Sequence, residues 1–162
     1  MGRTEAQIIK AARKITGLDA VKVGGNETCG VNNPNTPEAY VIFDEGFMAL
    51  NAEDQDTILW HERGHLEAFK DTRSANTKLQ NAYLYGFCGS DREWDRLHWA
   101  AELEADLCAA KHVGFDRVER ILTNIHIIKA VERQQIRMAN LKLAWDLTPR
   151  PTKHWIRRLF GR

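Results

Sequence analysis

The stretch NAEDQDTILWHERGHLEAF, residues 51–69, decides the fold and most of the chemistry expected of this chain. Asn51 is a preferred N-cap residue, and the carboxylates of Glu53 and Asp54 suit the positive end of a helix dipole. Apolar side chains then recur at helical spacing as far as the final phenylalanine. We therefore predict a helix over this stretch.

The same stretch contains the pattern His-Glu-x-x-His. His61 and His65 are four positions apart, so on a helix both imidazoles lie on one face, close enough to bind one zinc ion. Glu62 lies beside the first histidine, where its carboxylate can take a proton from metal-activated water without being a ligand. Gly64 has no side chain and would let a neighbouring element approach closely. The pattern predicts a catalytic metal site that still needs a third ligand.

The third ligand is expected from a second helix, which carries AELEAD over residues 101–106. Catalytic zinc usually has three protein ligands, and the third comes from another element facing the same cleft. Glu102 and Asp106 share one helix face, whereas Glu104 points about 200° away round the axis and is expected to face solvent with Lys111. We predict Glu102 as the ligand and Asp106 as the acceptor for the outer N–H of a ligand histidine.

The other segments predict an α+β protein that is mainly helical, with a small antiparallel sheet or hairpin before the histidine-bearing helix. Turn residues and short apolar runs over 18–50 favour two or three strands. A polar linker is expected at about 71–78. Further helices are predicted at residues 4–16, ended by Gly17; from Ser90, with Glu93 completing a capping box, to a left-handed cap at Gly114; and from Asp116 to about Trp145.

Size and composition favour one domain over residues 1–162, with a basic tail at 148–162. A formal net charge of +1 gives no overall field that would attract nucleic acid or an anionic membrane. No apolar run is long enough to span a membrane and the N-terminus has no secretory signal, so we expect a cytoplasmic protein. An odd number of cysteines, 3, without C-x-x-C spacing also fits a reducing compartment.

In order and spacing, these motifs resemble the HtpX and CAAX-prenyl-protease type of zinc metallopeptidases, which are gluzincins. An apolar strand, a short helix start, His-Glu-x-x-His and a later Glu-x-x-Ala-Asp follow one another over residues 38–69 and 100–116. A weaker similarity at 149–159 lacks the family's His and Arg, and the transmembrane helices of many relatives are missing. The resemblance implies a zincin-like fold and one zinc ion, with His61, His65 and Glu102 as ligands, Glu62 as base and Asp106 as a supporting acid.

These features predict a zinc metalloendopeptidase that hydrolyses a peptide or protein substrate through metal-activated water. The resemblance implies that the substrate lies extended beside the AYVIF strand, residues 39–43, and pairs with its backbone. A further donor should stabilise the oxyanion that forms during attack. The candidates for this donor or for substrate contacts are His98, His112, His126, Tyr83 and Tyr85.

Three alternatives stay open at this stage. The regulatory peptidases of the ImmA/IrrE type share a similar Glu-x-x-Ala-Asn motif. A noncatalytic metal-binding protein of a larger assembly, for example a virus particle, would explain a long final helix that offers more surface than a small core needs. The basic tail, with Trp155 and Phe160 among its positive charges, is also a candidate contact for nucleic acid or a membrane surface.

Overall fold

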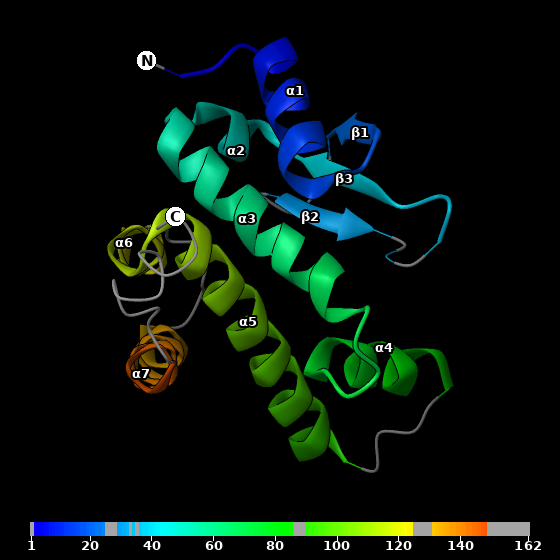
Figure 1. Cartoon of the computed structure of the whole chain (residues 1–162), viewed down its shortest axis with the longest axis vertical. Helices are drawn as coiled ribbons and strands as arrows, with labels where there is room; N and C mark the ends of the chain where they lie inside the picture. The colour runs from blue at the N-terminus through cyan, green and yellow to red at the C-terminus, as the bar shows by residue number, and fades with distance from the viewer. Residues whose placement is uncertain are drawn as a thin grey trace, which may run out of the picture.

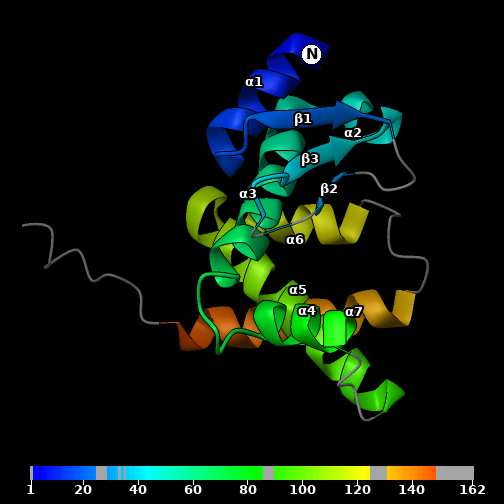
Figure 2. The same cartoon turned by 90° about the vertical axis from the view of Figure 1, so that its right-hand side faces the viewer.

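The computed structural model of the chain describes residues 2–24, 29–32, 34, 36–85, 90–124 and 131–148. Figures 1 and 2 show α3 and α5 packed together in the middle of the molecule, with α1 and the sheet on one side and α6 and α7 on the other. The α+β, mainly helical character is as predicted. In chain order the elements are α1 (Glu5–Thr16), β1 (Ala20–Val23), β2 (Cys29–Asn32), β3 (Tyr40–Phe43), α2 (Glu45–Ala49), α3 (Ala52–Ala68), α4 (Ala75–Tyr85), α5 (Asp91–Val113), α6 (Phe115–Asn124) and α7 (Val131–Leu147).

The sheet is mixed: the predicted antiparallel hairpin is present, whereas the alternative of an antiparallel sheet is not. Its strand order is β1-β3-β2, with β2 antiparallel to β3, as in the expected hairpin. β1 lies on the far side of β3 and runs parallel to it. Local turn residues predict which neighbouring strands form a hairpin, but not which edge of the sheet an earlier strand joins. The parallel pairing of β1 with β3 therefore could not be predicted from the sequence pattern.

This strand order also corrects the expected substrate position. The AYVIF strand, β3, is hydrogen-bonded to β1 on one side and to β2 on the other, so neither of its edges is open to a peptide. β2 is an edge strand of the sheet, and it is the strand that packs against α3 (Figure 1).

Capping residues begin and end several helices where the sequence predicts. Asn51 accepts a hydrogen bond from the backbone N–H of Asp54 at the start of α3, and Ser90 accepts one from the N–H of Glu93 at the start of α5. Gly17 ends α1 in the left-handed conformation, at φ 76° and ψ 9°. Gly114 differs from the prediction, because its φ of 94° is combined with an extended ψ of 148°.

Two segments depart from the predicted helix pattern. The expected linker at 71–78 is in its second half the beginning of α4, where Ser74 accepts a hydrogen bond from the backbone N–H of Thr77. The single helix predicted from Asp116 to Trp145 is two helices, α6 and α7, that pack against each other and against α5. Two helices that contact each other cannot be one continuous helix, so the contact between α6 and α7 overturns the prediction.

Two apolar clusters lie on opposite sides of α3. The first joins α1, the sheet and α2 to one face of α3, and the second joins α5, α6 and α7. Their buried members are, in the first, Ile8, Ala12, Val41, Phe43, Phe47 and Leu59, and in the second, Ala109, Ala110, Val118, Leu122 and Leu141. α3 contacts both clusters, the first through Leu59 and the second through Trp60.

Gly64 sets the distance between α3 and α5, as predicted for a helix residue without a side chain. A Cβ atom at this position would lie 2.7 Å from the Cα of Ala105 and 2.8 Å from the Cβ of Cys108. Carbon atoms in ordinary contact are about 3.5–4.0 Å apart. The two helices therefore approach more closely than any residue larger than glycine allows.

None of the helices in the described ranges combines the length and the apolar character that crossing a bilayer requires.

Candidate metal centre

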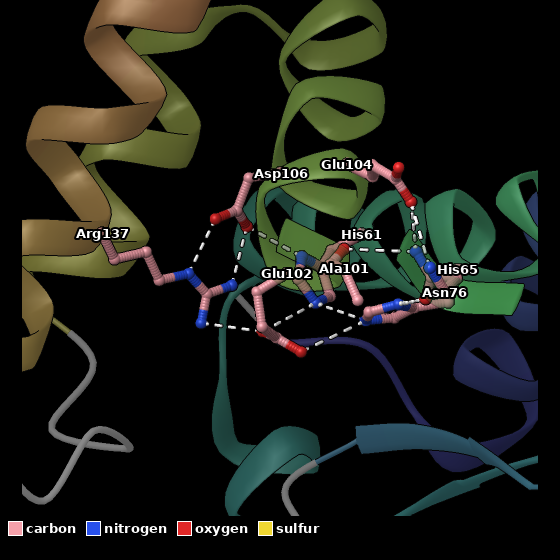
Figure 3. Close-up of polar contacts among 8 residues, drawn as sticks. All are labelled: His61, His65, Asn76, Ala101, Glu102, Glu104, Asp106 and Arg137. Carbon is pink, nitrogen blue, oxygen red and sulfur yellow. Dashed lines mark hydrogen bonds and ion pairs between the residues drawn. The ribbon is translucent and has the colours of Figure 1, made fainter. Parts of the chain in front are cut away.

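Three side chains from α3 and α5 converge where the two helices meet (Figure 3). The Nε2 atoms of His61 and His65 lie 3.1 Å apart. Glu102 places Oε2 3.6 Å from the Nε2 of His61 and Oε1 3.6 Å from the Nε2 of His65. The predicted ligand set is thus brought together, and within the described residues it is the one group of this kind whose atoms are suitably close.

The spacing of these side chains suits a single bound ion, because one ligand atom from each lies within 4.8 Å of the other two. Zinc bonds of about 2.0–2.2 Å to nitrogen and oxygen, at tetrahedral angles, separate the ligand atoms by about 3.3–3.5 Å. The two Nε2 atoms are 3.1 Å apart, and each lies 3.6 Å from a different oxygen of Glu102. The side chains are half-buried, with between 16% and 19% of their surface exposed, which leaves a side open for water or substrate. The residues present therefore fit the ion that the sequence motif implies.

The outer nitrogen of each histidine has its own acceptor. The Nδ1 of His61 lies 2.8 Å from Oδ1 of Asp106, and the Nδ1 of His65 lies 2.6 Å from Oδ1 of Asn76. Both oxygens can only accept, so we assign the proton of each ring to Nδ1. Each Nε2 then presents a lone pair toward Glu102. Three electron-pair donors facing one point are the arrangement that a cation stabilises.

Asp106 has the place predicted for it, whereas Asn76 was missed. Asn76 lies in the segment expected to be a linker, and its amide group is oriented by two further contacts. Its Nδ2 donates to Oε2 of Glu104 at 2.9 Å and to the backbone oxygen of Ala101 at 3.3 Å. These bonds leave Oδ1 facing His65. Ser74, a preferred N-cap residue that accepts from the backbone N–H of Thr77, was the available signal for a helix start here.

Glu104 does not face solvent, and that expectation is wrong. It is half-buried, and its carboxylate accepts hydrogen bonds from the backbone N–H groups of Ala75 at 2.9 Å and Asn76 at 3.3 Å. Free N–H groups at a helix N-terminus attract a carboxylate, and α4 presents such groups to this face of α5. Glu104 therefore supports His65 indirectly, by fixing Asn76 and the start of α4.

Arg137 is a second site residue that sequence reasoning missed. From α7 it donates through Nε to Oδ2 of Asp106 at 2.7 Å and through Nη2 to Oδ1 at 2.8 Å. Its Nη1 is 2.9 Å from Oε2 of Glu102. One guanidinium thus holds both the candidate ligand and the carboxylate behind His61 (Figure 3). No local motif marks this arginine, because the contact depends on how α7 returns to α5.

The charges at the site keep both carboxylates ionised. Burial alone would raise the pKa of Asp106, but hydrogen bonds from His61 and Arg137 outweigh it and lower the pKa to about 2. Burial likewise opposes ionisation of Glu102, yet positive charge on the neighbouring histidines, when they are protonated, and on Arg137 lowers its pKa below the ordinary value. The pKa of Arg137 is raised, because its carboxylate partners outweigh its own burial.

Glu62, the candidate base, is buried, with 7% of its surface exposed. It lies between the two histidines in the chain, and its charge contributes to raising the pKa of Arg137, which also holds Glu102. Its negative charge therefore acts on the same group of side chains as the candidate ligands. The role of general base stays a prediction.

The structure describes the side chains of two of the five candidate oxyanion donors, His98 and His112. His112 is exposed and stacks on Trp60, with ring centroids 3.6 Å apart, so its ring is engaged away from the ligand group. His98 is also exposed and lies one helical turn before Glu102 on α5, where it stays a candidate. The side chains of Tyr83 and Tyr85 and the whole of His126 lie outside the described residues.

Comparisons with protein-family models, with curated proteins and with solved structures found no match. The resemblance to gluzincins therefore stays a prediction from the motifs, and the geometry of the side chains carries the case for a metal centre.

Proposed function

We propose that this protein is a zinc-dependent peptidase whose metal is held by His61, His65 and Glu102. One observation carries the proposal: the two Nε2 atoms and the Glu102 carboxylate meet within 3.6 Å of one another. Both Nδ1 atoms are at the same time engaged by outer acceptors. Histidines that only stabilise a fold do not need to point together at an ionised carboxylate.

In the proposed reaction the metal ion and the residues around it have separate roles. When bound, zinc supplies a Lewis acid that activates water and polarises the substrate carbonyl. Glu62 takes the proton from the attacking water and delivers it to the leaving amine. Asp106 and Asn76 hold the imidazoles in the orientation and tautomer that ligation requires. Carboxylate partners also increase the basicity of a histidine ligand.

The substrate is expected to lie extended along β2. This strand is an edge of the three-stranded sheet and packs on α3, so it lies close to the helix that carries both histidines. An unpaired strand edge can accept a peptide as an additional strand. A regulatory peptidase of the ImmA/IrrE type would use the same centre and differ in its substrate alone.

The decisive test compares two glutamates of α3. Glu62→Gln should retain the zinc affinity of the wild type and lower cleavage of a proteome-derived peptide library by about 10²–10⁴-fold, the usual contribution of a general base. Glu67→Gln is the matched control. Glu67 lies on the same helix, is exposed and pairs with Arg63, so its replacement should leave both zinc binding and cleavage unchanged.

Two results would count against the proposal. Wild-type protein that binds no zinc at micromolar concentration, measured by competition with a chromogenic chelator, would remove the metal centre. Metal-loaded wild type that cleaves no member of the library, or Glu62→Gln that cleaves as fast as the wild type, would remove the peptidase.

A second candidate function is a noncatalytic role within a larger assembly. Ile136, Leu143 and Leu147 expose 53%, 62% and 75% of their surfaces, and the spacing i, i+7, i+11 places them on one face of α7. Exposed apolar stripes of this kind mark interaction surfaces. The structure therefore supplies an observation in favour of a partner at α7, whereas residues 149–162 of the basic tail lie outside the described residues.

Light scattering after size-exclusion chromatography tests this candidate. An assembly role predicts oligomers or complexes that Leu143→Glu disrupts while zinc binding persists. A monodisperse monomer that cleaves peptides, with the same behaviour in Leu143→Glu, would leave the peptidase as the sole function.

A further inference from the structure

The contacts of Arg137 link α7 to Glu102, a candidate ligand, and to Asp106, which accepts from the outer nitrogen of His61. Its Nε and Nη2 bind the two oxygens of Asp106, which orients His61, and its Nη1 binds Oε2 of Glu102. Only 13% of the arginine side chain is exposed. Arginine is suited to this position, because its rigid fork of donors can satisfy two carboxylates together.

The contact with Glu102 also selects one of its oxygens for the metal. Arg137 engages Oε2 at 2.9 Å, whereas Oε1 faces the Nε2 of His65 at 3.6 Å. A carboxylate with one oxygen held in this way binds a metal through the other. Single-oxygen ligation from Glu102, with two imidazoles, leaves one position of a tetrahedral zinc ion open.

The packing of α7 against the rest of the chain is otherwise modest. Among its described side chains, Leu141 alone is fully buried, with Met138 and Trp145 partly covered. Three large apolar side chains of the same helix face solvent. The ion pairs of Arg137 are therefore a substantial part of what holds α7 on α5.

We propose that Arg137 is a positioning residue that couples the docking of α7 to the binding of the metal ion. The inference rests on the proposed metal centre. Docked α7 holds Glu102 and Asp106 where they can serve the ion, and the bound ion fixes the two carboxylates to which α7 is attached. Coupling of this kind is reciprocal, so each event strengthens the other by the same factor.

A purely electrostatic role makes the opposite prediction. Arg137 is a permanent positive charge close to the ion, and like charges repel. If charge alone mattered, its removal would tighten zinc binding and a lysine would substitute for it. If positioning dominates, neutral and lysine replacements both weaken zinc binding, because lysine offers a point charge and cannot bridge the two carboxylates.

Zinc affinity, measured by chelator competition, separates these cases without any dependence on turnover. Arg137→Lys and Arg137→Met are both expected to bind zinc at least about 10-fold more weakly than the wild type. Arg120→Met is the matched control: Arg120 also bridges two carboxylates, of Glu53 and Asp54, but on the surface of α6, and its loss should leave zinc affinity unchanged. Equal affinity in Arg137→Lys, or tighter binding in Arg137→Met, would overturn the proposal.

Hydrogen exchange of the wild type provides a test that needs no variant, so a folding defect cannot obscure it. Addition of zinc should slow exchange of the α7 amides at residues 137–147 by several-fold more than that of the α1 amides. An unchanged rate in α7, or equal slowing of both helices, would refute the coupling. If zinc binds and both tests give the expected results but no peptide is cleaved, the peptidase proposal is wrong and the coupling proposal stands. If zinc does not bind, both proposals are wrong.

Discussion

Replacing Gly64 with alanine tests whether the close approach of α3 and α5 builds the metal centre. The new Cβ would lie 2.7 Å from the Cα of Ala105 and 2.9 Å from its backbone oxygen. Backbone atoms cannot rotate away, so the helices must separate by about 0.8 Å to restore an ordinary carbon contact of about 3.5 Å. Overpacking of this kind costs about 1–3 kcal/mol, which the better helix propensity of alanine offsets by up to about 1 kcal/mol.

We therefore expect Gly64→Ala to lose about 1–2 kcal/mol of unfolding free energy. With a urea dependence of about 2 kcal/mol per molar, the unfolding midpoint of the metal-free protein should fall by about 0.5–1 M. The same separation would lengthen the 3.6 Å distances between Glu102 and the histidines to about 4.4 Å, beyond the tetrahedral spacing. Zinc affinity should then fall at least about 10-fold.

Gly46→Ala is a suitable control, since the atoms nearest to its new Cβ belong to the side chain of Asp44, the closest at 3.1 Å, and both residues precede the helix that carries the histidines. Its zinc affinity should equal that of the wild type. A Gly64→Ala protein that is as stable as the wild type and binds zinc equally well would refute the argument that the helix approach at this residue sets the ligand geometry.

The remaining predictions concern ligands, their support and a thiol. Glu102→Ala should weaken zinc binding far more than Glu104→Ala, and the reverse order in chelator competition would overturn the ligand assignment. Asn76→Ala should weaken zinc binding about 10–100-fold through loss of the His65 contact, and an unchanged affinity would show that this contact is dispensable. Burial and the neighbouring Glu67 raise the pKa of Cys108 to about 11, so its alkylation, followed by peptide mass spectrometry, should be slow at pH 8 and accelerate about tenfold per pH unit up to pH 10. A rate that levels off near pH 9 would show an ordinary thiol.

The parts of the site that were predictable are those set by local helix geometry. The spacing of His61 and His65, and that of Glu102 and Asp106, places each pair on one helix face whatever the rest of the chain does. The glycine between the histidines predicted that another element packs closely there, but not which element. Cap residues likewise marked the starts of α3 and α5.

The parts that were missed depend on contacts between distant segments. Glu104 has the position on its helix that was expected, but the start of α4 covers that position. Arg137 reaches the site because α7 is a separate helix that packs on α5, where periodicity suggested one continuous helix from Asp116. The parallel pairing of β1 with β3 is also set by tertiary packing. In each case the sequence supplies the residue but not its partner.

The two histidines are backed by unlike partners, and this makes them unequal donors. His61 is hydrogen-bonded to an ionised carboxylate, whereas His65 is hydrogen-bonded to a neutral amide. A carboxylate draws the Nδ1 proton toward itself and enriches the electron density at the opposite nitrogen. When zinc is bound, His61 would accordingly be the stronger of the two histidine donors.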